Sequence, residues 1–491
     1  MTWVNLILVV LPIVVVAGSR PIKGASDGLY FETHFNNFNK PYNFNNRKQH
    51  GKKSGGWEPG ANTGSNTGVN NFEAATYKKV GWRLIPFLLL CYVVAYLDRV
   101  NVGFAKLQML QDLQFSDTVY GLGAGIFFIG YFLFEVPSNV ILHRVGARVW
   151  IARIMVTWGV ISAGMMFVES VTSFYVMRFL LGVAEAGFFP GIILYLTYWY
   201  PAARRARMTA LFMSAIALSG VIGGPLSGWI MQSFVGMGGL KGWQWLFVLE
   251  GLPSVAVGIA TLFYLDDSID GAKWLTSPEK ELLKRNISLD NASKQHLSIS
   301  AVFKDGRVWL LGLIYFSFVM GLYGVSFWLP TIIKTTGVKD AFQIGMLTAI
   351  PYGSAVVAMI FVSRSADRTG ERRWHIAVPA LLGAVGLVLS VTWGQNTVLA
   401  MTALTLATMG ILTTLPLFWS LPTSFLAGAG AAAGIALINS VGNLAGFVSP
   451  FAVGWLKDMT QSTNAGMYLL AVSLVVGALL TLSVPARLVS K

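Results

Sequence analysis

The stretch FYVMRFLLGVAEAGFFPGIILYLTYW, residues 174–199, carries two charges, Arg178 and Glu185, inside an otherwise apolar run. A membrane-spanning helix needs about 20 apolar residues, so this run is long enough to cross a bilayer. The two charges are nearly two helical turns apart, so we expect both side chains on one face, roughly 10 Å apart along the axis. Ionisable groups inside a membrane are costly and commonly mark a substrate or proton pathway. The alternative is a structural charge pair that ties two helices together.

The composition is that of an integral membrane protein. The 491 residues are 54% hydrophobic and only 12% charged, whereas a soluble domain has about 25% charged residues. The net charge of +14 does not indicate nucleic-acid binding, because the basic residues fall mainly in short loops between apolar runs, the positive-inside pattern. The single cysteine, Cys91, excludes an intrachain disulfide framework. No phosphate-binding loop, paired metal-ligand spacing or nucleophile motif is present, so we expect no enzyme activity, metal or cofactor.

The order of apolar and polar segments predicts the architecture. Twelve apolar segments follow residue 80, and the polar loop 266–305 divides them into six and six. We predict an all-α membrane protein with twelve transmembrane helices in two six-helix bundles, 73–265 and 306–491, joined by this loop as a cytoplasmic linker. An even number of spans with basic loops inside places both ends of the core in the cytoplasm. Residues 1–72 are a short apolar run and then an Asn-, Gly- and Lys-rich segment, which we interpret as a disordered extension absent from the mature protein.

The two halves repeat a basic loop. The loop after the second span reads HRVGARVW (143–150), and the loop after the eighth reads ADRTGERRW (366–374). Repetition between halves is typical of secondary transporters, whose sites lie at the interface of the repeats near mid-membrane. We interpret the charged residues of these loops as conformational latches that pair across the cytoplasmic face in one state and release in the other: Arg144, Arg148, Asp367, Arg368 and Arg372.

Three longer strings carry a family resemblance: YLDRVNVGFAKLQML (96–110), GAGIFFIGYFLFEVPSNVILHRVGARVWIARIM (123–155) and RFLLGVAEAGFFPGIILYLTYWYP (178–201). With the twelve spans and twin basic loops, they resemble the anion:cation symporter family of the major facilitator superfamily, especially its tartrate, phthalate and aromatic-acid permeases. The resemblance covers about residues 73–490.

The resemblance implies roles for the charged residues inside the spans. In that family the fourth-helix arginine binds the substrate carboxylate and the glutamate after it carries the coupling proton, which here are Arg178 and Glu185. A guanidinium stays charged when buried and fits a carboxylate, and a carboxyl in a low-dielectric cavity can gain and lose a proton. The resemblance also makes Asp98 a second protonation site and Arg99 a cavity or gating cation. The alternative is a helix-end pair near the outer side of the first span, with both charges reaching the interface.

Further polar residues are candidates for substrate binding: Tyr96, Tyr131, Tyr323, Asn439 and Asn443. Asn439 resembles the family's substrate-contacting position, and an uncharged amide can bind a carboxylate or hydroxyl in mid-membrane. The alternative for both asparagines is interhelical hydrogen bonding beside small residues. Glu135, near the cytoplasmic end of the second span, is interpreted as a structural partner of the basic loops.

Taken together, these features predict a monomeric secondary transporter in the plasma membrane, the inner membrane of a bacterium. Its partners are lipid, protons and a small organic anion, a carboxylate such as tartrate, phthalate or hydroxyphenylacetate, taken up by proton-coupled symport and alternating access. One alternative is a drug–proton antiporter, favoured by GVIGGPLSG (220–228), which resembles a motif of that group. The other is a non-transporting nutrient receptor on the same fold.

Overall fold

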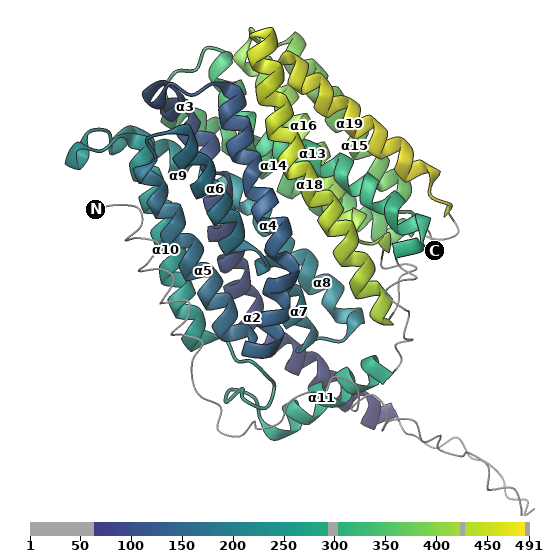
Figure 1. Ribbon diagram of the computed structural model, residues 1–491. Helices are drawn as coiled ribbons and strands as arrows, with labels where there is room; N and C mark the ends of the chain where they lie inside the picture. The colour runs from purple at the N-terminus through teal and green to yellow at the C-terminus, as the bar shows by residue number, and fades with distance from the viewer. Residues whose placement is uncertain (1–62, 293–302, 423–427, 487–491) are drawn as a thin grey trace, which may run out of the picture. The chain divides into compact units, whose positions relative to one another are not determined.

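Apolar runs dictate the fold, because the backbone groups of a lipid-exposed segment must find their hydrogen bonds within the segment. The computed structural model describes residues 63–292, 303–422 and 428–486, and the regular elements in these ranges are helices (Figure 1). Twelve helical segments are long and apolar enough to cross a membrane, which confirms the prediction of an all-α protein with twelve spans. The chain has two compact units, Met1–Ala75 and Thr76–Lys491. The description below concerns the second.

Within each six-span half the helices follow one another with short connections. The first six spans are built from α2 (Thr63–Val100) with α3 (Val102–Leu113), α4 (Asp117–Val145), α5 (Ala147–Gly164), α6 (Val171–Glu185) with α7 (Phe188–Thr197), α8 (Ala202–Met213) with α9 (Ala215–Ser233), and α10 (Gly242–Tyr264). The second six are α13 (Gly306–Thr335), α14 (Ala341–Thr369), α15 (Arg373–Thr392), α16 (Thr397–Phe418), α18 (Gly428–Thr460) and α19 (Asn464–Ser483).

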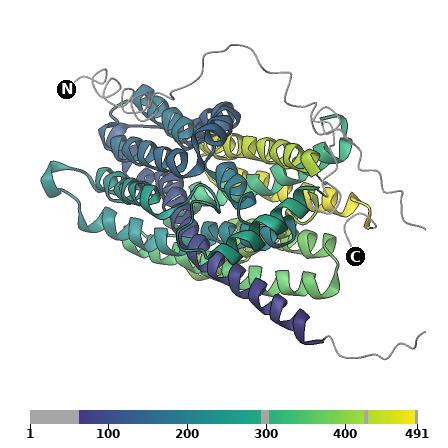
Figure 2. The same ribbon diagram turned by 90° about the horizontal axis from the view of Figure 1, so that it is seen from below.

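Each half packs mainly on itself. In the first half α5 packs against α10 and α4 against α6, and in the second α15 packs against α16 and α19 while α13 packs against α18. Three pairs join the halves, α4 with α18, α9 with α14 and α3 with α13, and Figures 1 and 2 show α4 and α18 side by side. The segment predicted as a linker contains a helix, α11 (Ser277–Ala292). The domain boundaries themselves stay a prediction.

Helix breaks differ from the sequence-based expectations. The predicted continuous helix through 174–199 divides after Glu185, because Ala186 leaves the helical region and Gly187 adopts φ 85°, a left-handed value that favours glycine. The first span continues through α3 to Leu113. The interpretation of Asp98 and Arg99 as a pair at the outer end of that span is therefore wrong, and both side chains are buried within it.

The amino-terminal part of α2 also differs from its prediction. α2 begins at Thr63, so the last residues of the segment predicted to be disordered are helical. Adding residues to an existing helix costs far less than starting one, which permits such an extension of an apolar span into a polar segment. Residues 1–62 lie outside the described part of the chain.

The halves touch directly on the side away from the two basic loops. A methyl group on Gly345 of α14 would lie 2.2 Å from the carbonyl oxygen of Gly224 on α9, and one on Gly121 of α4 would lie 2.4 Å from that of Pro450 on α18. Small residues permit such backbone contact in membranes. The motif at 220–228 therefore acts here through close helix approach.

Charged and polar groups reinforce this contact. Asp458 of α18 accepts hydrogen bonds from the backbone N–H groups of Asp117 and Thr118 at 3.2 and 2.7 Å, and so caps the amino terminus of α4 across the interface. The Asp117 carboxylate pairs with Lys457 at 2.9 Å and with the buried Lys106 at 2.6 Å. The Lys106 ammonium also lies 3.2 Å from the centre of the Trp328 ring of α13. These contacts close the interface at this end.

Candidate substrate and proton site

A cavity between the two halves has one cation in its wall, Arg99, near the end of α2. Aromatic, aliphatic and amide side chains from both halves form the rest of the lining: Tyr92, Phe128, Tyr131, Phe189, Met213, Ile216, Tyr315, Val319, Leu322, Tyr323, Leu415, Asn439 and Asn443. Four of the residues predicted to bind substrate therefore join Arg99 at one cavity: Tyr131, Tyr323, Asn439 and Asn443. Their meeting depends on contact between α2, α4, α13 and α18.

Arg99 is bonded to both halves of the molecule. Its Nη2 forms an ion pair with Glu185 Oε1, and its Nη1 donates a hydrogen bond of 3.0 Å to the hydroxyl oxygen of Tyr323. The guanidinium carbon lies 5.6 Å from the ring centre of Tyr131 and 5.4 Å from that of Phe127. Arg99 is 5% exposed and its Nε has no hydrogen-bond partner. A cation so placed can exchange a protein carboxylate for a substrate carboxylate.

Arg178 occupies a different environment from Arg99. It is fully buried and donates from Nε to the carbonyl oxygen of Gly123 at 3.2 Å and from Nη2 to that of Ala124 at 3.4 Å, both on α4. It does not line the cavity, and its Nη1 has no hydrogen-bond partner. The structure thus pairs Glu185 with Arg99, while the proposed role of Arg178 as a substrate ligand stays a prediction.

Asp98 faces away from the cavity, into the first half. Its Oδ1 accepts from Ser162 at 2.8 Å, and its Oδ2 accepts from Trp158 Nε1 at 3.0 Å and from the hydroxyl of Ser254. Side chains of adjacent residues on a helix point about 100° apart, so Asp98 contacts the helices of the first half while Arg99 lines the central cavity. A protonation role for Asp98 stays a prediction.

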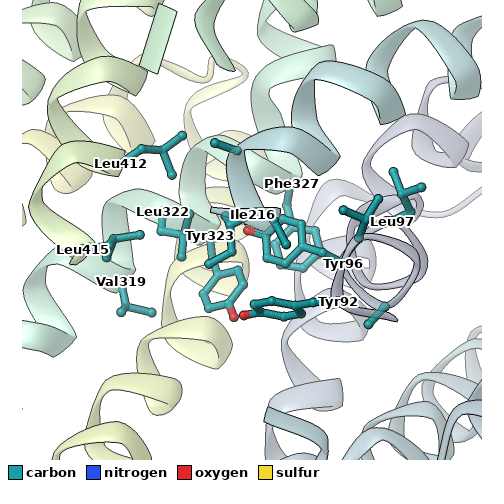
Figure 3. Close-up of a cluster of buried hydrophobic side chains, with 14 of the residues drawn as sticks. Tyr92, Tyr96, Leu97, Ile216, Val319, Leu322, Tyr323, Phe327, Leu412 and Leu415 are labelled. Atoms are coloured by element: carbon teal, nitrogen blue, oxygen red, sulfur yellow. The ribbon is translucent and has the colours of Figure 1, made fainter. Parts of the chain in front are cut away.

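Tyrosines surround the cation. Figure 3 shows Tyr92 and Tyr96 of α2 and Tyr323 of α13 turned toward one another. The Tyr96 hydroxyl lies 3.2 Å from Ser326 Oγ, which also accepts a hydrogen bond of 3.2 Å from Tyr352. Tyr96 therefore lies in a hydroxyl network, and it lines a second cavity rather than the central one.

The interpretation of Glu135 as a structural partner of the basic loops is wrong. This carboxyl is buried, and its Oε1 accepts a hydrogen bond of 3.2 Å from Nδ2 of Asn439, so it faces α18 and not the basic loops. The signal was available, because Glu135 follows the predicted cavity residue Tyr131 by one turn and shares its face. Tyr92, one turn before Tyr96, is a cavity residue that the same periodicity would have indicated.

Two of the predicted latch arginines form ion pairs, and these pairs do not join the two six-span halves. Arg148 Nε lies 3.7 Å from Asp267, and Arg372 donates to Asp367 at 2.8 Å. Neither pair crosses between the two halves. Arg144 and Arg368 are exposed. A latch across the basic face stays a prediction for another conformation.

Comparison with known proteins decides the family. The sequence pattern of the Major Facilitator Superfamily matches residues 88–450. The chain belongs to this superfamily. It is therefore a multi-pass membrane transporter, which agrees with the resemblance found in the sequence and with the twelve spans.

Three relatives and one solved structure illustrate the similarity. The chain is 50% identical to "Putative metabolite transport protein NicT" of Pseudomonas putida over 86% of this chain and 97% of that protein. It is 52% identical to a "Putative tartrate transporter" of Agrobacterium vitis (84% and 95% covered), and 44% identical to the "Quinolone resistance transporter" of Acinetobacter baumannii (85% and 96% covered). The fold resembles that of the xylose transporter XylE from E. coli in a partially occluded inward-open conformation, with TM-score 0.64, 15% identity, and 82% and 98% of the chains covered.

Proposed function

We propose that this transporter is a proton-coupled symporter that takes up a small organic anion carrying a carboxylate. The single observation that supports this best is the ion pair of Arg99 with Glu185 in the wall of the central cavity. The relatives named as metabolite and tartrate transporters support the same substrate class. The distribution of basic residues favours cytoplasmic basic loops in the inner membrane of a bacterium, and we propose a monomer.

The ion pair suggests how proton and anion are coupled. A proton on Glu185 cancels the negative charge that holds Arg99, and Arg99 then donates to the substrate carboxylate. The empty carrier holds Arg99⁺ with Glu185⁻, and the loaded carrier holds Arg99⁺ with the anion and a neutral Glu185. For a substrate that enters with one negative charge, the Arg99–Glu185 site has no net charge in either state. Binding the anion without the proton leaves a net negative charge inside the membrane, which is costly, and such a carrier does not reorient.

Other residues position the substrate in this scheme. The Tyr323 hydroxyl oxygen accepts a hydrogen bond from Arg99, so its own O–H can donate to a second substrate oxygen. Asn439 and Asn443 present amides from the opposite half, so a substrate held by both sides draws the halves together. Arg178 lies close enough to Glu185 and Arg99 for its charge to act on both. We propose that its positive charge favours binding of an anionic substrate in the cavity.

The test is uptake by the full chain in proteoliposomes. Labelled tartrate, phthalate, hydroxyphenylacetate and nicotinate are offered under an inward proton gradient, and we expect one or more to accumulate. Glu185→Gln, which mimics the protonated acid, should lose gradient-driven accumulation and retain anion exchange, while Arg99→Gln should lose both. Uphill transport by Glu185→Gln, or full activity of Arg99→Gln, contradicts the proposed coupling.

A second function has support from one relative. The 44% identical protein is named as a quinolone resistance transporter, and quinolones are aromatic acids that also carry a carboxylate. The aromatic lining of the cavity suits such a ring. Expulsion of a quinolone from vesicles with an inward proton gradient, in the absence of uptake of any small acid, would favour proton-driven export over symport.

A further inference from the structure

A second cavity lies between the halves, beyond Tyr96 from the central cavity and away from the basic loops. Its wall includes polar groups from both halves: Tyr96, Asn101, Ser227, Ser326, Thr348 and Tyr352. Gly223 and Gly224 of α9 leave another part of its wall without side chains. A cavity with several hydroxyl and amide groups can hold water, because each water needs two or more polar partners.

An acid lies directly behind this wall. Glu250 of α10 is 2% exposed, and Ser227 donates a hydrogen bond of 2.6 Å to its Oε1. Its Oε2 has no hydrogen-bond partner. Asn101 lies against the same carboxyl, is 1% exposed, and neither polar atom of its amide meets the geometry of a hydrogen bond. Buried polar atoms nearly always have partners, so the unpaired atoms of Glu250 and Asn101 beside this cavity indicate a bound water or ion.

Within the described ranges, no lysine or arginine forms an ion pair with Glu250. The charged group that acts on it most is Asp98, a like charge on α2. The groups facing Asp98 are neutral donors, Trp158 and Ser162 of α5 and Ser254, one turn after Glu250 on α10. Among the residues that the structure describes, neither acid takes part in an ion pair. An uncompensated buried charge costs several kcal/mol, so this acid pair needs either a proton or a small cation.

We infer that Glu250 is a proton-binding site that is filled through the second cavity, past Asn101 and Ser227. A hydronium ion in the cavity gives its proton to Oε2 of the Glu250 carboxylate and leaves as water, and release is the reverse step. This inference rests on the proposed proton coupling and deepens it. Glu185 is paired with Arg99, which lines the central cavity, whereas Glu250 is bonded to Ser227, which lines the second cavity. The two acids therefore exchange protons through different cavities.

Infrared difference spectroscopy of the reconstituted full chain tests this directly. A pH step is applied without any organic anion and with choline as the only monovalent cation, and the carbonyl stretch of protonated carboxyl groups is recorded. We expect a pH-dependent band that is lost in Glu250→Gln and retained in Glu169→Gln, a matched change at an exposed glutamate. Ser227→Ala removes the donor to Oε1 and should shift the frequency of the band, which provides a second readout if Glu250→Gln does not fold.

Two results would overturn the inference that Glu250 binds a proton. A spectrum that Glu250→Gln and Ser227→Ala both leave unchanged overturns the inference. Loss of the band when sodium replaces choline, at constant pH, shows that the acid pair binds a cation, and also overturns it. The measurement uses no transported anion, so its failure leaves the proposed symport standing, and failure of uptake leaves the proton site standing.

Discussion

Substitution of Gly345 by alanine should open the interface between the halves on the side away from the basic loops. The new Cβ would lie 2.2 Å from the carbonyl oxygen of Gly224, whereas ordinary van der Waals contact of a Cβ begins at 3.4 Å. The two atoms must separate by 1.2 Å, the difference between these distances. The obstacle is backbone, so no side chain can rotate away. Overpacking of this kind costs about 1–3 kcal/mol, and the cost falls only on the conformation in which α9 and α14 touch.

The expected magnitude follows from that cost. A bias of about 1–3 kcal/mol changes the ratio of two conformations by roughly 5- to 150-fold. Cys91 is the only cysteine in the sequence, so Cys91→Ala gives a clean background. In that background Ser326→Cys, on α13 at the second cavity, reports opening, because Ser326 is buried here. Gly345→Ala should raise the labelling rate of this cysteine by a maleimide at least fivefold.

A matched control lies on the same helix. A methyl group on Gly353 of α14 would meet only Val221 Cγ2 at 3.9 Å, an ordinary contact, so Gly353→Ala should leave the labelling rate unchanged. A cysteine at Asn443, in the central cavity, should become less reactive in Gly345→Ala as the halves close there. Equal labelling in Gly345→Ala and Gly353→Ala would refute the reasoning that this glycine contact favours the observed conformation.

Three further predictions concern single side chains. Asp458→Asn weakens the cap on α4, typically worth about 0.5–2 kcal/mol, and should increase labelling of an introduced cysteine at the second cavity. Unchanged labelling would mean that this cap does not help to hold the two halves together. Asn439→Ala removes the hydrogen bond from Nδ2 to Glu135 Oε1 and should lower thermal stability by about 1–3 kcal/mol in a melting assay; retention of full stability would mean that another donor satisfies Glu135. Arg372→Gln breaks an ion pair with Asp367, whose side chain is 69% exposed. The free energy of unfolding should therefore fall by less than about 1 kcal/mol in a melting assay; a larger loss would indicate an unrecognised contact across the basic face.

Local rules explain why much of the fold was predictable. Each span must be apolar over the thickness of the bilayer, and its backbone groups must form hydrogen bonds within the span. Hydropathy alone therefore indicated twelve helices. The same rules failed where a charge interrupts an apolar segment. The first span was predicted to end near Arg99 and reaches Leu113 instead, because Lys106 is buried against Asp117 and Trp328 and so does not end the span.

The candidate site was predictable as a set of residues but not as a set of contacts. Tyr131, Tyr323, Asn439 and Asn443 were named from their positions on predicted helices, and they do line one cavity with Arg99. Arg178 and Glu185 were expected to project from one face of a continuous helix. Glu185 instead pairs with Arg99, 86 residues away, because α6 ends at Glu185 while Arg178 turns toward the carbonyl oxygens of α4.

By itself the sequence determined the number of spans, the two halves, and which residue types enter the membrane, because these depend on hydropathy and charge along short stretches. Only the tertiary structure decided which buried charges meet. Arg99 joins Glu185, Lys106 joins Asp117, and Glu250 lies behind the second cavity near Asp98. The physical reason is that a buried charge takes its partner from whichever neighbouring helix brings one within reach, and helix packing is set by small residues and close backbone approach far along the chain.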